Sequence, residues 1–181
     1  MRACYLGLLA LSPLAVAALE ESTALAPVVV TATRTAETAD ETLASVSVVT
    51  REDIERAQVR SVPDALRGLP GVTFSNSGGP GKLTSVSLRG TNTSHVLVLV
   101  DGVRIGSATA GITSLETLPI EQIERIEVVR GPRSSLYGSE AIGGVIQLFT
   151  RKGGGPLRPR VSAGAGTYET VNGSLGLSGG G

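Results

Sequence analysis

The chain has 181 residues, which is enough for one domain with its own hydrophobic core. Its 16 basic and 16 acidic residues balance, so the charge shows no footprint for nucleic acid or for an anionic membrane surface. Three tyrosines, two phenylalanines and no tryptophan also exclude an extended base-stacking platform, and 24 glycines indicate a turn-rich, β-rich chain.

The N-terminus has the pattern of an export signal. Arg2 precedes an apolar run that is interrupted at Pro13, and Ala15 and Ala17 match the small-residue cleavage pattern. We therefore expect residues 1–17 to be a cleaved signal peptide. The alternative is a membrane anchor, but the apolar run is shorter than the roughly 18 residues that a spanning helix needs. Cys4 would be removed with the signal, so cysteine usage does not identify the compartment.

A short β-prone run follows the signal. Residues 18–26 are small and polar, and residues 35–42 are rich in Thr, Ala, Glu and Asp, so the run between them has no partner nearby in the sequence. It is either the first strand of the domain or a strand kept free to add to the sheet edge of another protein. We expect residues 18–34 to be a mobile tail that carries this strand, whose residues are Val28, Val29, Val30, Thr31, Ala32 and Thr33.

The next segment predicts one strand and two short helices. Residues 45–50 alternate as a strand, and Thr50 and Asp53 then form a capping-box pattern for a helix with Ile54 and Ala57 on its apolar side. Ser61 is the predicted N-cap of a second helix, which has a proline in its first turn and ends at Pro70-Gly71.

Further strands follow at short intervals. Residues 72–75 and 84–89 are predicted strands, and the continuous apolar run 96–100 predicts a strand buried on both faces. Asp101-Gly102 is a hairpin turn signal that leads to residues 103–105. A short helix at 120–123 should precede strands at 125–130 and 145–150. Because strands and helices alternate without a βαβ repeat, we predict an α+β fold with a mixed sheet.

No motif for catalysis is present. The sequence lacks a Walker loop, a GxGxxG after a strand, a GxSxG and paired His or Cys spacing. His95 is the only histidine, and its polar neighbours favour a turn residue over a base or metal ligand. We expect no enzyme activity, no catalytic residue, no metal site and no cofactor.

Residues 123–150 read IERIEVVRGPRSSLYGSEAIGGVIQLFT. From the pattern alone this is a strand–turn–strand unit with solvated charges. The segment also resembles the signature of the plug domain of TonB-dependent outer-membrane receptors. The run DALRGLPGVTF matches the helix-to-strand motif of the same family. The resemblance covers most of the chain after the signal and implies a plug over residues 35–152.

The C-terminal residues have a different pattern. After the glycine-rich break at 153–155, residues 160–166 and 170–178 alternate between apolar and polar side chains, which is typical of barrel strands that cross a membrane. A soluble hairpin is the alternative. Because two strands cannot close a barrel, we expect residues 153–181 to be the start of the barrel of a longer receptor.

The resemblance also implies partners and a location. Family members lie in the outer membrane with the plug and tail facing the periplasm, and the inner-membrane protein TonB supplies energy through the TonB box, here residues 28–33. The run RGTNTSHVLVLVDGVR is similar to that of cobalamin (vitamin B12) receptors. By position, the residues that correspond to ligand contacts are Leu83, Ser85, Asn92, Thr109 and Ala110.

Two other functions remain open. A receptor for ferric siderophores is one, because related plugs share RGP and DGVR. A non-transporting periplasmic binding or signalling module is the other. A reading frame that continues beyond residue 181 would favour a receptor over the module.

Overall fold

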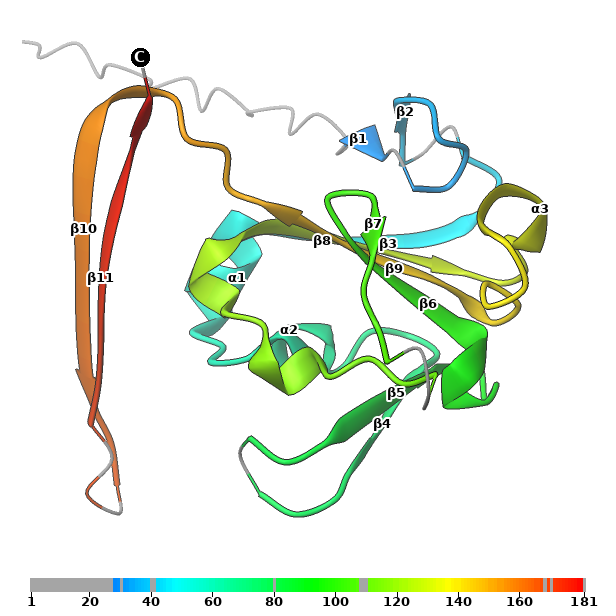
Figure 1. Cartoon of the computed structure of the whole chain (residues 1–181), viewed down its shortest axis with the longest axis horizontal. Coiled ribbons are helices and arrows are strands. Elements are labelled where there is room, and N and C mark those ends of the chain that lie inside the picture. The colour runs from blue at the N-terminus through cyan, green and yellow to red at the C-terminus, as the bar shows by residue number, and fades with distance from the viewer. Residues whose placement is uncertain are drawn as a thin grey trace, which may run out of the picture.

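The computed structural model describes residues 28–29, 31–39, 42–79, 81–107, 111–167, 169 and 171–180 (Figure 1). The expected signal peptide and the first part of the expected tail lie outside these residues, as do Val30, Thr109 and Ala110.

A five-stranded mixed sheet forms the centre of the main body. Its order is β3-β8-β9-β6-β7. Only β6 and β9 pair in parallel, and the other neighbours are antiparallel. The mixed α+β sheet predicted from the sequence is therefore confirmed. The strands are β3 (Ser45–Thr50), β6 (Val96–Val100), β7 (Val103–Arg104), β8 (Ile123–Arg130) and β9 (Gly144–Thr150).

Short helices and two-stranded sheets surround this sheet. The helices are α1 (Arg51–Ala57), α2 (Val62–Leu66) and α3 (Ser134–Tyr137), with single 3-10 turns at Thr93–His95, Leu115–Thr117 and Ile120–Gln122. The small sheets pair β1 (Val28–Val29) with β2 (Glu37–Thr38), β4 (Val72–Asn76) with β5 (Thr84–Leu88), and β10 (Gly155–Ala165) with β11 (Val171–Gly180). Helices α1 and α2 and the β4–β5 hairpin lie on one side of the central sheet, and β1 and β2 lie on the other (Figure 1).

Side chains alternate between the two faces of the central sheet, and its inner strands β6, β8 and β9 are largely buried on both faces. Val98, Ile126 and Ile146 belong to the larger apolar cluster, which includes buried residues of α1, α2 and β5. Leu97 and Leu99 lie in a separate cluster on the opposite face with Ala141 and Val145. The prediction that residues 96–100 are buried on both faces is confirmed.

Several local predictions are also confirmed, but α2 ends at Leu66, before the predicted end at Pro70-Gly71, and the placement of Ala57 is wrong. Thr50 caps α1 in a capping box with Asp53, and Ser61 caps α2. Ala57, however, is exposed rather than facing the core, because α1 ends there and Gln58 adopts a left-handed conformation at φ 50.

Thr50→Ala should destabilise the fold by about 0.5–2 kcal/mol, since it removes the helix cap. The Thr50 hydrogen bonds lower the pKa of Asp53 from its ordinary value of 3.8. A lowered folded-state pKa contributes stability above pH 3.8 that is lost as the pH falls below it. Denaturant melts should therefore show a larger Thr50→Ala effect at neutral pH than at about pH 3. An equal effect at both values would contradict this coupling.

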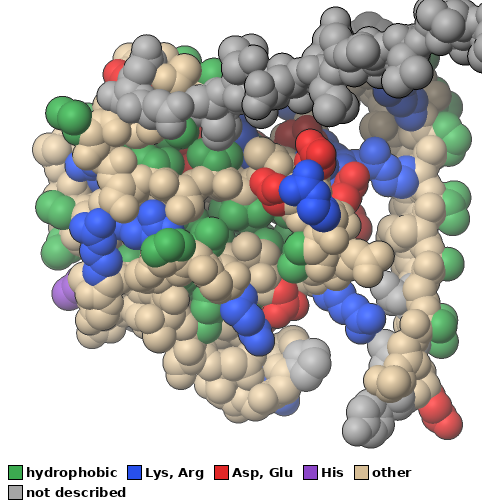
Figure 2. All heavy atoms as spheres, turned by 180° about the vertical axis from the view of Figure 1, so that it is seen from behind, with side chains coloured by type: hydrophobic (Ala, Val, Ile, Leu, Met, Phe, Trp, Pro, Cys, Tyr) green, Lys and Arg blue, Asp and Glu red, His purple; other side chains and the backbone are tan. Residues whose placement is uncertain are grey.

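The β10–β11 hairpin stands apart from the main body. Its strands pair antiparallel with Val161 opposite Leu175, and β10 begins at Gly155, earlier than predicted. Val161, Leu175 and Leu177 are each exposed by more than two thirds. Figure 2 shows hydrophobic side chains spaced along the outer side of this hairpin. The hairpin thus presents an apolar face that the described part of the chain does not cover. Among the described residues, no helix is long and apolar enough to cross a membrane.

Candidate functional site

The N-terminal strip is defined here as residues 28–33, and its described residues pack against the central sheet. Val29, Thr31 and Ala32 are at most 3% exposed, and Val29 and Ala32 form an apolar cluster with Val129 of β8. Among the described residues of the strip, Val28 and Val29 form a strand paired with Thr38 and Glu37, and Thr31 to Thr33 form a turn. The described part of the strip is therefore held more closely than the sequence predicts, and it is not one continuous strand.

Thr31 makes polar contacts between the strip and the central sheet. Its backbone N–H donates to Oε2 of Glu127 at 2.9 Å, and its hydroxyl donates to the same oxygen at 2.5 Å. The hydroxyl also lies 3.2 Å from Oε1 of Gln147. The Tyr137 hydroxyl donates to the carbonyl oxygen of Thr31 at 3.0 Å. The backbone N–H, the carbonyl oxygen and the hydroxyl of Thr31 thus all form hydrogen bonds.

Glu127 is fully buried in the middle of β8. Arg125 donates from Nε to Glu127 Oε1 at 2.9 Å, and the Arg125 guanidinium lies 3.9 Å from the centre of the Phe149 ring. A buried carboxylate requires hydrogen bonds of this kind. The prediction of solvated charges is therefore wrong at Glu127, because the strip covers the face of the sheet that carries it.

A second buried charge lies at the end of β8. The Arg130 guanidinium donates to the hydroxyls of Ser45 and Ser47, at 3.4 and 2.6 Å. Burial lowers the pKa of Arg130, and the positive charge of Arg89 adds to this effect. Arg130 Nε has no hydrogen-bond partner among the described residues. Arg130 is thus a second residue for which the prediction of solvated charges is wrong.

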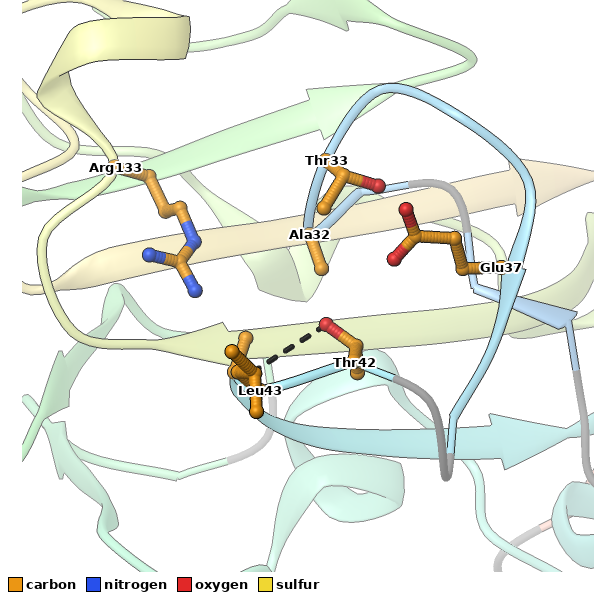
Figure 3. A pocket seen from close by; sticks show the side chains of 7 residues that line it. Ala32, Thr33, Glu37, Thr42, Leu43 and Arg133 are labelled. Carbon is orange, nitrogen blue, oxygen red and sulfur yellow. Dashed lines mark hydrogen bonds between the residues drawn. The ribbon is translucent and has the colours of Figure 1, made fainter.

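An open pocket of about 440 Å³ lies beside the strip (Figure 3). Glu37 and Arg133 lie on opposite sides of it, and Leu43 at its edge is fully exposed. The lining residues are Ala32, Thr33, Glu37, Thr42, Leu43, Ala44 and Arg133. The pocket thus has a charged residue of each sign on its walls.

Three of the predicted ligand contacts, Leu83, Ser85 and Asn92, lie among the described residues. Leu83, in the loop between β4 and β5, is 43% exposed, and Ser85 in β5 is half-buried. Asn92 is exposed and precedes the 3-10 turn Thr93–His95, without a side-chain cap hydrogen bond. The β4–β5 hairpin and the strip lie on opposite sides of the central sheet (Figure 1). Leu83 and Ser85, which belong to this hairpin, therefore lie on the opposite side of the central sheet from the described part of the strip.

Two residues that the sequence did not single out, Asn76 and Glu116, stabilise the β4–β5 hairpin. Asn76 donates from Nδ2 to the Thr84 hydroxyl at 2.8 Å and accepts from the Gly78 N–H at 2.8 Å. Glu116 accepts from the Thr84 N–H at 3.2 Å. Asn76 stabilises the start of the loop, but a polar residue beside a glycine-rich turn gives no specific signal for this role. Glu127 was also missed, although an acidic residue set between Ile126 and Val128 in the apolar part of a strand is a usable signal.

Among the described residues, no group of three or more His, Cys, Asp or Glu side chains could hold a metal ion.

The fold and the comparisons agree on the family. Residues 38–145 match the model of the TonB-dependent receptor plug domain, which is more than half of the chain. The chain therefore belongs to the TonB-dependent receptor plug domain family.

Among its relatives are two proteins named vitamin B12 transporter BtuB. The chain is 54% identical over 123 residues to that of Vibrio vulnificus, with 68% of this chain and 20% of the relative covered. It is 47% identical over 142 residues to that of Vibrio cholerae serotype O1, with 78% and 23% covered. The chain thus spans less than a quarter of the length of these relatives.

A solved structure supports the same fold. The ferric yersiniabactin uptake receptor FyuA from Yersinia pestis has a TM-score of 0.62 and 28% identity, with 76% of this chain and 22% of that chain covered.

Proposed function

We propose that this chain is the plug-bearing part of a TonB-dependent outer-membrane receptor that takes up cobalamin. The observation that carries the proposal is the identity of 47–54% to proteins named vitamin B12 transporters. Residues 28–33 serve as the TonB box on the periplasmic side, and the ligand binds on the opposite side of the plug. The separation of the strip from the β4–β5 hairpin supports this division of roles (Figure 1).

The domain assignment belongs to the proposal. Residues 1–17 are the signal peptide, residues 18–34 carry the TonB box and residues 35–152 form the plug. Residues 153–181 begin the barrel, and the exposed apolar face of β10 and β11 supports this assignment. Membrane lipid would cover that face in the complete receptor.

The ligand residues of the proposal are Leu83, Ser85 and Asn92, together with Thr109 and Ala110 of the next loop. They are uncharged and suit a ligand recognised by contact surface and neutral hydrogen bonds. The test is a titration of the purified full-length receptor with cyanocobalamin and with a ferric siderophore. Binding of cyanocobalamin in preference to the siderophore would support the proposal.

Asn92→Ala should weaken cobalamin binding about two- to tenfold, since it removes a neutral hydrogen bond worth roughly 0.5–1.5 kcal/mol. Because Asn92 is exposed and its side chain does not cap the following turn, stability should not change. Calorimetric titration of the full-length receptor gives the affinity. Ser135→Ala, at an exposed serine of α3, is the control and should bind as the wild type does. Unchanged affinity in Asn92→Ala would remove Asn92 from the site.

A siderophore receptor is the second candidate, because solved structures of similar fold include siderophore receptors such as FyuA. In the titration above, tight binding of a ferric siderophore without binding of cyanocobalamin would favour it. A receptor that binds a ligand but shows no energised uptake would instead favour the non-transporting module.

A further inference from the structure

The hydrogen bonds that hold the N-terminal strip involve groups that a partner strand would need. Addition of a strand to another sheet requires free backbone N–H and C=O groups. In the structure the Thr31 N–H is bonded to Glu127 and the Thr31 carbonyl to Tyr137. Val28 and Val29 are paired with β2. The packed strip and a strip added to a TonB sheet therefore exclude each other.

We propose that Glu127 is the positioning residue that sets how often residues 28–33 are available to TonB. This inference rests on the proposed function, because it takes the strip to be the TonB box. Glu127 thus controls coupling from the plug side, without contacting TonB or the ligand.

The geometry indicates that Glu127, rather than the apolar contacts, determines the position of the strip on the sheet. Two donors of one residue, the N–H and the hydroxyl of Thr31, converge on a single carboxylate oxygen. Hydrogen bonds to an ionised acceptor are about twice as strong as neutral ones. Burial of Val29 and Ala32 is favourable but not directional. The carboxylate therefore determines which residue of the strip lies over β8.

The same arrangement allows the strip to leave. Arg125 pairs with the other oxygen of Glu127, and its side chain is 32% exposed. When the strip departs, water can solvate Oε2 while this ion pair stays in place. The open state therefore leaves no buried charge without a partner, and it can be populated reversibly.

Thr31 and Thr33 provide a matched pair for the test. Thr31 is buried on Glu127, whereas Thr33 is exposed and its hydroxyl contacts only the neighbouring Thr35. Thr31→Val removes one hydrogen bond to the carboxylate and keeps the branched shape. Thr33→Val makes the same chemical change where no such bond exists. Glu127→Gln replaces the carboxylate with a neutral amide and leaves the sequence of the strip unchanged.

The experiment measures hydrogen exchange by mass spectrometry in the full-length receptor without ligand. Loss of one hydrogen bond to a charged group should raise the rate of backbone hydrogen exchange in residues 28–38 about tenfold. We expect this increase in both Glu127→Gln and Thr31→Val. Peptides from β6 and β9 should exchange as in the wild type, and Thr33→Val should show no change. The affinity of Glu127→Gln for the purified periplasmic domain of TonB should rise by up to about tenfold. The reason is that the apparent affinity scales with the fraction of receptors in which the strip has left the sheet.

Three outcomes would overturn the proposal. Unchanged exchange in residues 28–38 would show that Glu127 does not hold the strip. Faster exchange throughout β6, β8 and β9 would show that Glu127 stabilises the sheet instead. Faster exchange in the strip without tighter TonB binding would show that the two do not compete. Failure of the proposed function is distinct, because it would appear as a wild-type receptor without TonB binding or cobalamin uptake.

Discussion

Val28→Pro in the full-length receptor should abolish energised uptake and leave cobalamin binding intact. Proline removes the backbone donor at a position of the proposed TonB box, and strand addition depends on such donors. Val28 suits the test because its side chain is 49% exposed, so little packing is lost. Val29 is less suitable. It is 1% exposed, and even Val29→Thr would bury a hydroxyl in an apolar site at a cost of about 1–3 kcal/mol.

The measurement is paired, with ligand binding and uptake determined on the same variants. Val28→Thr is the control, since it keeps the backbone donor and a branched side chain, and it should transport as the wild type does. Normal uptake by Val28→Pro would show that Val28 is not part of the TonB box. Loss of cobalamin binding would point to a folding role for the strip instead.

Gly144→Ala should prevent stable folding of the plug. A Cβ at this position would overlap the Val129 carbonyl oxygen and lie 2.6 Å from Cδ1 of Leu88. The backbone φ of +149° adds strain for any residue with a side chain. Overpacking and backbone strain each cost about 1–3 kcal/mol, so a combined loss of roughly 2–6 kcal/mol is expected. Because one contact is with the backbone of β8, a rotamer change cannot relieve it.

Denaturant unfolding of the chain, together with the yield of full-length receptor in the outer membrane, tests this expectation. Gly79→Ala is the control, because nothing lies within 4 Å of its added Cβ. It should unfold as the wild type does. A Gly144→Ala chain within about 0.5 kcal/mol of the wild type would show that β8 and β9 can separate to accommodate the methyl group.

The sequence by itself was sufficient to predict structural features that depend on residues close together in the chain. The cap of α1 involves Thr50 and Asp53, three positions apart, so the pattern already contains both partners. The turn at Asp101-Gly102 has positive φ at both residues, as the residue types predict. The run 96–100 is apolar at every position, so its burial on both faces followed from composition alone.

Only the tertiary structure decided where the strip lies and what Glu127 does. Thr31 and Glu127 are 96 residues apart, and their contact depends on the register of β8 between β3 and β9. Alternation along β8 places Glu127 on the same face as Val129, but it does not say what covers that face. The strip that covers it is a short β-prone run, and its sequence fits equally well a strand that is free to pair with another protein. Its packing results from the apolar cluster around Val29 and Ala32 and from two hydrogen bonds that no local pattern encodes.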